Sequence, residues 1–213
     1  SQPAELTQTS VIDGLDYLGN IDISAGVIEV KGEHFNLPLE GFHNAMNFML
    51  ALAVTKEIGI DSEKIQNIKV ELPPGRSKSL QFGGILVLDE TYNASPESVK
   101  ASLDLLSIKP GRHFAVLGTM FELGDKSLRW HSDIMKKAVE LGLDGVIAVS
   151  QGPEAKAMAS IGSQLPYFKI VSKPEDAFPC LESVLRTGDS VLLKGSRQVG
   201  LERLLPFLQK ISR

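Results

Sequence analysis

Short runs of β-branched and other apolar residues alternate with longer amphipathic segments from residue 85 onward. In the longer segments the apolar residues recur every three or four positions, which is the spacing of an amphipathic helix, whereas the short runs predict strands. Regular alternation of strands with helices is typical of a parallel sheet with helices on both faces, so we predict a doubly wound α/β fold. The predicted strands are 85–88, 113–117, 145–149, 167–171 and 190–193.

Local signals mark two of the predicted helices. Ser95 can cap the first helix, and Pro96 fits the first helical position after it. Pro179 lies inside the predicted helix 174–185, so we expect either a kink at this proline or a later start of the helix. The other predicted helices are 127–141, 153–161 and 198–211, and the apolar face of the first helix consists of Val99, Leu103 and Leu106.

Residues 1–79 follow a different pattern, with two segments of strand character before a helix that ends near Gly59. The sequence Pro-Pro-Gly at 73–75 then interrupts the chain shortly before the strand and helix alternation begins. We therefore expect two domains, 1–79 and 80–213, the first with too few elements to enclose a core alone. The two early strand segments are 27–30 and 34–39, and one face of the helix is predicted to carry Met46, Met49, Leu50, Ala53 and Val54.

Composition excludes several classes of protein. The 213 residues are 43% hydrophobic, and 22 Lys and Arg stand against 26 Asp and Glu without a basic stripe, so a nucleic-acid partner is not expected. No apolar run approaches the roughly 20 residues that span a bilayer, so we expect neither a membrane partner nor a membrane anchor. A single cysteine, Cys180, excludes an intramolecular disulfide and suits a reducing compartment, so we expect the cytoplasm. The four histidines lack metal-site spacing, which predicts no zinc site.

Three polar loops follow predicted strands, at 89–93, 118–124 and 194–197. Ligands of open α/β sheets collect at the carboxyl ends of the strands, so we expect the three loops to face one crevice. Ordinary turn chemistry is the alternative for any single loop. The segment Lys194-Gly195-Ser196-Arg197 before a predicted helix is a candidate anion site, but the chain contains no G-x-x-x-x-G-K-[ST] phosphate loop. It also lacks a G-x-G-x-x-G dinucleotide fingerprint.

Three residues near the start of the early helix are also candidates for function. His43-Asn44 opens this helix, and an Asn cap beside an imidazole is the alternative explanation. Asn47 lies one turn further on, where a polar side chain projects toward whatever approaches the helix. His113 lies in a predicted strand and is expected to be scaffold.

Five segments together resemble the Mur ligase family in order and spacing. Its members are three-domain enzymes, and the resemblance implies the tail of the central ATP-binding domain followed by the whole Rossmann-like C-terminal domain. The phosphate loop and main Mg²⁺ ligands of the family would lie outside this chain, so the chain alone is expected to be inactive. The segments are 41–47, 75–76, 89–98, 122–124 with His131, and 194–197 with Glu202.

The resemblance implies an ATP-dependent amide ligase of peptidoglycan precursor synthesis. ATP would phosphorylate the terminal carboxylate of a UDP-N-acetylmuramoyl-tripeptide, and the amine of D-alanyl-D-alanine would attack the acyl phosphate. We expect a monomer. One alternative is a non-catalytic binding or regulatory module with a ligase-derived fold. Another is a related folylpolyglutamate- or cyanophycin-type ligase.

The resemblance also implies roles for individual residues. Two positions depart from the family pattern, because Glu90 stands where the family usually has Asp and Thr119 stands where it has Asp. Glu122 and His131 would orient a loop. The implied ATP-binding residues are His43, Asn44, Asn47, Arg76 and Glu90, and the implied substrate-binding residues are Tyr92, Asn93, Lys194, Ser196 and Arg197.

Overall fold

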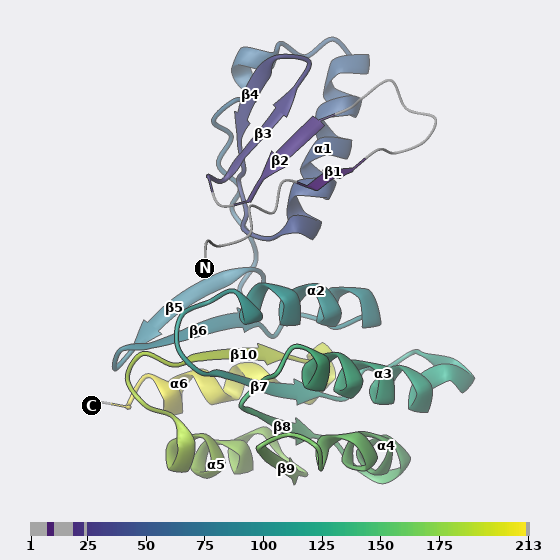
Figure 1. Cartoon of the computed structure of the whole chain (residues 1–213), viewed down its shortest axis with the longest axis vertical. Helices are drawn as coiled ribbons and strands as arrows, with labels where there is room; N and C mark the ends of the chain where they lie inside the picture. Colours follow the sequence, from purple (N-terminus) through teal and green to yellow (C-terminus); the bar gives the residue numbers. More distant parts are fainter. Residues whose placement is uncertain (1–7, 11–18, 24, 212–213) are drawn as a thin grey trace, which may run out of the picture. The chain divides into compact units, whose positions relative to one another are not determined.

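A computed structural model of the chain describes residues 8–10, 19–23 and 25–211 (Figure 1). The chain forms two compact units, Ser1–Glu71 and Leu72–Arg213. This division comes earlier than the boundary near residue 80 that the sequence suggests. The physical reason is strand β5 (Lys78–Phe82), which pairs antiparallel with β6 (Ile85–Glu90) and so belongs to the second unit.

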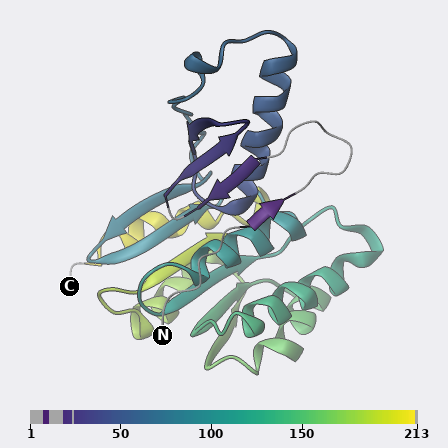
Figure 2. The ribbon, with the colours of Figure 1, turned by 45° about the horizontal axis from the view of Figure 1, so that its top comes forward.

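The first unit contains a four-stranded antiparallel sheet in the order β1-β2-β3-β4, with helix α1 (Phe42–Glu57) packed along it (Figure 2). Ile28 of the sheet is fully buried and belongs to one apolar cluster with Phe48 and Met49 of the helix. The strands are β1 (Gln8–Ser10), β2 (Gly19–Asp22), β3 (Val27–Val30) and β4 (Glu33–Asn36), and a short 3-10 turn, η1 (Ser62–Lys64), follows the helix.

Helix α1 has apolar residues on two faces. Phe48, Met49 and Leu52 are buried against the sheet, whereas Leu50 and Val54 are 46% and 60% exposed. The predicted face that combined Met49 with Leu50 and Val54 therefore does not coincide with the buried face. Apolar periodicity alone cannot separate two faces when both are apolar.

The start of α1 does not match the alternative explanation in which Asn44 is its cap. The helix begins at Phe42, and its N-cap is Gly41, which has φ 97°. Asn44 lies within the first turn, where its Nδ2 donates to the carbonyl of Glu40 at 2.6 Å. Glycine at the cap position supplies the positive φ, so the helix starts before the first residue with a capping side chain.

The second unit is built on a six-stranded sheet in the order β5-β6-β10-β7-β8-β9. All five predicted strands are present and parallel, which confirms the doubly wound, mostly parallel α/β fold. Strand β5 adds an antiparallel edge that the sequence pattern did not reveal. The remaining strands are β7 (His113–Gly118), β8 (Gly145–Val149), β9 (Tyr167–Val171) and β10 (Ser190–Lys194).

Helices cover both faces of this sheet (Figure 1). Successive residues of β7 alternate between two cores, because Leu117 packs with the helices on one face and Val116 with those on the other. One face carries α2 (Pro96–Ser107), α3 (Ser127–Glu140) and α4 (Gly152–Gly162), and the opposite face carries α5 (Ala177–Val184) and α6 (Leu205–Leu208).

The local helix signals have clear outcomes. Ser95 caps α2 through a capping box with Ser98, and Pro96 occupies the first turn, as predicted. Pro179 lies in the first turn of α5, whose α-helical part starts only after the 3-10 turn η3 (Pro174–Asp176), so the later start is the correct alternative.

The single helix predicted for 198–211 is wrong. Gly200 has φ 73° and separates the 3-10 turn η4 (Arg197–Val199) from η5 (Leu201–Leu204), after which α6 is only a short helix. Arg203 stabilises the break by donating from Nε to the carbonyl of Gly200 and from Nη2 to that of Val199. A left-handed residue interrupts the helical ladder even where the apolar spacing continues.

Candidate functional site

A crevice opens at the carboxyl ends of β7 and β10, which are neighbours in the sheet. The chain leaves β7 toward α3 on one face and leaves β10 toward α6 on the other, which is the topological switch point of a doubly wound sheet. Two cavities of about 600 Å³ and 580 Å³ lie there. They share Phe121, Glu122, Leu123 and Gln198 as lining residues.

The first cavity brings together the three loops that the sequence singled out. Tyr92 and Asn93 come from the loop after β6, Glu122 from the loop after β7, and Ser196 and Arg197 from the segment after β10. The last two segments are also tied to each other, because the Oγ of Ser196 accepts from the backbone N–H of Phe121 at 3.0 Å. Four of the five predicted substrate-binding residues therefore line one cavity.

Lys194 is the exception, because its side chain is only 4% exposed and does not line the cavity. Its Nζ lies 3.6 Å from a carboxylate oxygen of Glu90 and donates to the carbonyl of Asn93 at 3.2 Å. Burial, and in smaller part the charge of Arg76, lowers the pKa of Lys194, while Glu90 opposes the shift. Lys194 therefore stabilises the loop after β6.

Tyr92 connects this loop to the segment before β5. Its backbone N–H donates to the carbonyl of Gly75 at 2.8 Å. The guanidinium carbon of Arg76 lies 4.0 Å from the centroid of the Tyr92 ring, and that of Arg197 lies 5.1 Å from it. The side chain of Ser77 donates to Glu90, the last residue of β6, at 3.2 Å. Three contacts therefore connect the segment to the end of β6 and the loop after it.

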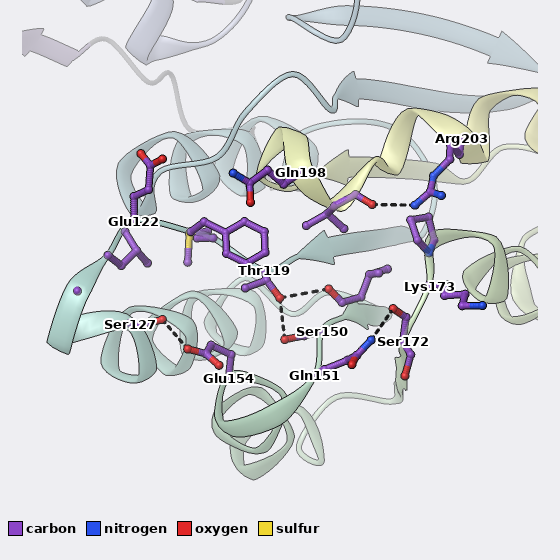
Figure 3. Close-up of a pocket in the computed structure, with 17 residues that line it drawn as sticks. Thr119, Glu122, Ser127, Ser150, Gln151, Glu154, Ser172, Lys173, Gln198 and Arg203 are labelled. Atoms are coloured by element: carbon purple, nitrogen blue, oxygen red, sulfur yellow. Dashed lines mark hydrogen bonds between the residues drawn. The ribbon is translucent and has the colours of Figure 1, made fainter.

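The second cavity contains residues that sequence reasoning missed (Figure 3). The Thr119 hydroxyl donates to the Ser150 hydroxyl at 2.9 Å, and the Ser127 hydroxyl donates to Glu154 at 2.9 Å. Lys173 lies at another part of the rim. Ser150 follows β8, and Ser172 and Lys173 follow β9, so their position after predicted strands was the available signal.

His131 supports the loop that separates the two cavities. Its Nε2 accepts from the N–H of Met120 at 3.0 Å, and its Nδ1 lies 2.8 Å from the carbonyl of Ser127. Because Nε2 accepts, Nδ1 must carry the proton, so the ring is neutral. Burial lowers the pKa of His131 and favours this neutral form. Glu122, two residues after Met120 in this loop, has φ 63°, which is a strained backbone conformation for a residue other than glycine.

The three candidates of the first unit lie close together at the start of α1. His43 and Asn47 are exposed and Asn44 is half-buried. They belong to the first compact unit, whereas the two cavities belong to the second. Among the described residues no cluster of three or more His, Cys, Asp or Glu can hold a metal ion. None of the described helices is long and apolar enough to cross a membrane.

Comparison with known proteins connects this geometry to a family. The family model described as Mur ligase, glutamate ligase domain, matches residues 75–197, which contain the six-stranded sheet and most residues that line the two cavities. The chain belongs to the Mur ligase family.

Its relatives point to one type of Mur ligase. The chain is 38% identical over 198 residues to the UDP-N-acetylmuramoyl-tripeptide--D-alanyl-D-alanine ligase of Synechocystis sp., covering 92% of this chain and 43% of the relative. MurF ligase from Thermotoga maritima in complex with ADP has a TM-score of 0.72 and 28% identity, covering 95% of this chain and 45% of that one. MurF from Acinetobacter baumannii has a TM-score of 0.75 and 28% identity, covering 91% and 42%. The chain spans less than half the length of these relatives.

The two departures from the Mur ligase pattern occupy defined places in this domain. Glu90 reaches both Ser77 and Lys194, so its longer carboxylate is already shared by two donors. Thr119 places its hydroxyl on Ser150 in the second cavity, so it retains a polar contact but no negative charge. Neither substitution leaves a buried polar atom unsatisfied among the described side chains.

Proposed function

We propose that the chain is the C-terminal part of an ATP-dependent ligase that adds D-alanyl-D-alanine to a UDP-N-acetylmuramoyl-tripeptide. The observation that carries the proposal is the first cavity, where three loops distant in sequence meet around one space. Two of these loops contribute Tyr92, Asn93, Ser196 and Arg197, and the third contributes Glu122. The names of the relatives in Synechocystis and Treponema pallidum support this choice of substrates. On this proposal the first unit is the end of the central ATP-binding domain, and the second unit, which includes β5, is the C-terminal domain.

The cavity suits a small zwitterionic peptide. Arg197 is exposed and lines the cavity, so its guanidinium can take the dipeptide carboxylate in a two-point contact. Lys194 is a poorer choice for this role, because Glu90 and the carbonyl of Asn93 already engage it. The exposed side-chain amide of Asn93 is available to orient the peptide.

The residues of this chain would mainly position the reactants. ATP, when bound with Mg²⁺, supplies the phosphoryl group that makes the substrate carboxylate reactive toward an amine. Arg76 is exposed and fits the phosphates, whereas Glu90 keeps only part of its acceptor capacity for a ribose hydroxyl. His43, Asn44 and Asn47 stay in the proposal as adenine-side residues. Holding the dipeptide amine at a fixed position contributes through proximity and orientation.

The test is an NMR titration of the ¹⁵N-labelled chain with D-alanyl-D-alanine, with L-alanyl-L-alanine as the stereochemical control. We expect shifts confined to the loops 92–95, 119–124 and 196–198 for the D,D-dipeptide. Arg197→Gln is expected to weaken this binding about tenfold or more, as loss of a charge-assisted contact does. Arg129→Gln, an exposed arginine on α3 paired with Asp133, is the matched control and is expected to leave affinity unchanged.

Chemical-shift changes confined to the second cavity, around Ser150 and Glu154, would mean that the dipeptide binds there and not in the first cavity. Equal binding of both stereoisomers, or none, would contradict the proposed substrate. A phosphate-release assay with all three substrates and the chain alone is expected to show no turnover. Turnover there would refute the assignment of the chain as one part of the enzyme.

A further inference from the structure

Two arginines distant in sequence share one aromatic ring at the edge of the first cavity. Arg76 precedes β5 and Arg197 follows β10, and their guanidinium carbons lie 4.0 Å and 5.1 Å from the centroid of the Tyr92 ring. Guanidinium groups are attracted to the face of an aromatic ring, and each contact contributes about 0.5–1 kcal/mol at an exposed site. The ring therefore offsets part of the repulsion between two cations held near each other.

Neither guanidinium is neutralised by the protein. Both arginines are exposed, and within residues 8–10, 19–23 and 25–211 neither pairs with a carboxylate. The nearby carboxylate of Glu90 is engaged by Lys194 and Ser77 instead. The surroundings of Tyr92 thus carry two positive charges whose hydrogen-bond donors remain available.

The ring itself is held in place by the backbone. The Tyr92 N–H donates to the Gly75 carbonyl, and Gly75 adopts φ 79°. A Cβ at this glycine would lie 2.7 Å from the Thr91 hydroxyl and 2.9 Å from the Tyr92 nitrogen, so only glycine allows so close an approach. Lys194 fixes the other side of the loop through the carbonyl of Asn93. Tyr92 hydrogen-bonds through its backbone N–H, and its ring contacts the two arginines.

We propose that Tyr92 is a positioning residue that holds Arg76 and Arg197 as one pair for an oxyanion. Two guanidinium forks on one ring suit a group whose oxygens can accept from both, such as a phosphoryl group or a carboxylate. The identity of that anion in the ligation rests on the proposed function, whereas the pairing of the arginines by the ring does not. Tyr92 acts here through the arginines and not by contact with the reacting atoms.

Calorimetric titration of the chain with inorganic pyrophosphate at low salt tests the pairing without reference to the reaction. Tyr92→Leu removes the ring and is expected to weaken pyrophosphate binding about tenfold, because both arginine side chains must then be ordered when the anion binds. Tyr92→Phe keeps the ring and is expected to bind within about twofold of the wild type. Arg76→Lys keeps the charge but loses the planar group, and its effect is expected to be smaller in the Tyr92→Leu background than in the wild type.

Three outcomes would overturn the proposal: no pyrophosphate binding by the wild type, unchanged affinity in Tyr92→Leu, or equal losses in Tyr92→Phe and Tyr92→Leu. The melting temperature of each variant is measured in parallel, and Tyr92→Phe provides the folded comparison if Tyr92→Leu is unstable. Titration with D-alanyl-D-alanine and with D-alanyl-D-alaninamide then distinguishes a carboxylate from a phosphoryl ligand. If the dipeptide fails to bind but the pyrophosphate series behaves as expected, the pairing stands and the proposed substrate is wrong.

Discussion

At the scale of single residues, His131 shows how a buried polar group fixes the loop between the two cavities. Its side chain is almost fully buried, and its two ring nitrogens bond to the backbone of Met120 and Ser127. Protonation of Nε2 would remove the acceptor for the Met120 N–H and place a charge in the core. The loop between the two cavities therefore depends on a neutral imidazole.

This dependence predicts a loss of stability in mild acid. Burial lowers the pKa of His131 in the folded chain below its ordinary value of 6.5, so the unfolded chain binds the proton more readily. The contribution of His131 to the free energy of unfolding is complete above pH 6.5 and falls as the pH drops below it. Urea unfolding between pH 8 and 5 should show a steeper decline for the wild type than for His131→Gln. Equal slopes would mean that the ring tolerates its charge.

Some cavity residues could be predicted from the sequence, whereas the surroundings of Lys194 could not. The place of Tyr92, Asn93, Ser196 and Arg197 at one cavity was predictable, because each follows the carboxyl end of a strand. The direction of the Lys194 side chain could not be predicted, because it depends on how β10 is aligned with the neighbouring strand. Lys194 lies beside Glu90 in the parallel pairing of β10 with β6, and no pattern within one strand reveals its neighbour in the sheet.

At the scale of elements, the amino and carboxyl ends of the strands in the second unit differ. The two cavities lie at the carboxyl ends, whereas the amino ends are joined by ionic and hydrogen-bond contacts. The amino end of β10 carries an ion pair in which Arg112 contacts both oxygens of Asp189, at 3.1 Å and 2.7 Å. Arg112 also donates to the carbonyl of Val184, and Asp189 accepts from the N–H of Arg186. These contacts stabilise the amino ends of the strands, opposite the cavities. A substitution there should lower the stability of the fold without changing ligand binding.

Asp189→Ala is therefore expected to lower the free energy of unfolding by about 3 kcal/mol, since it leaves Arg112 and a backbone N–H without their partner. Asp133→Ala removes a carboxylate from an exposed pair on α3 and should cost less than about 1 kcal/mol. Urea denaturation of both variants measures the difference. Binding of pyrophosphate by folded Asp189→Ala should match the wild type, and a clear loss would show that the amino edge communicates with the site.

The elements also show where sequence patterns lose information. The buried parallel strands and the capped helix α2 were predictable because apolar runs and a capping box are local signals. Strand β5 was missed because an edge strand is mostly exposed and lacks an apolar run. The C-terminal helix was predicted too long, because Gly200 breaks the helical hydrogen-bond pattern while the spacing of apolar residues continues.

At the scale of the whole molecule, the second unit contains a complete core. Buried apolar clusters lie on both faces of its six-stranded sheet, and its own helices cover each of them. In the first unit, by contrast, a single small cluster joins α1 to the sheet while Leu50, Val54 and Ile58 on that helix are exposed. The physical requirements for independent folding are met by residues 72–213.

We therefore expect residues 72–213, produced alone, to unfold cooperatively with a melting temperature within about 3 °C of the same transition in the whole chain, the shift that about 1 kcal/mol causes at this size. Scanning calorimetry measures both. Leu103→Ala, which truncates a fully buried side chain of α2, serves as the internal marker. It should lower the melting temperature of this transition equally in both proteins. A fragment that melts much lower, or a marker that affects only one protein, would show that the first unit supplies part of the second unit's stability.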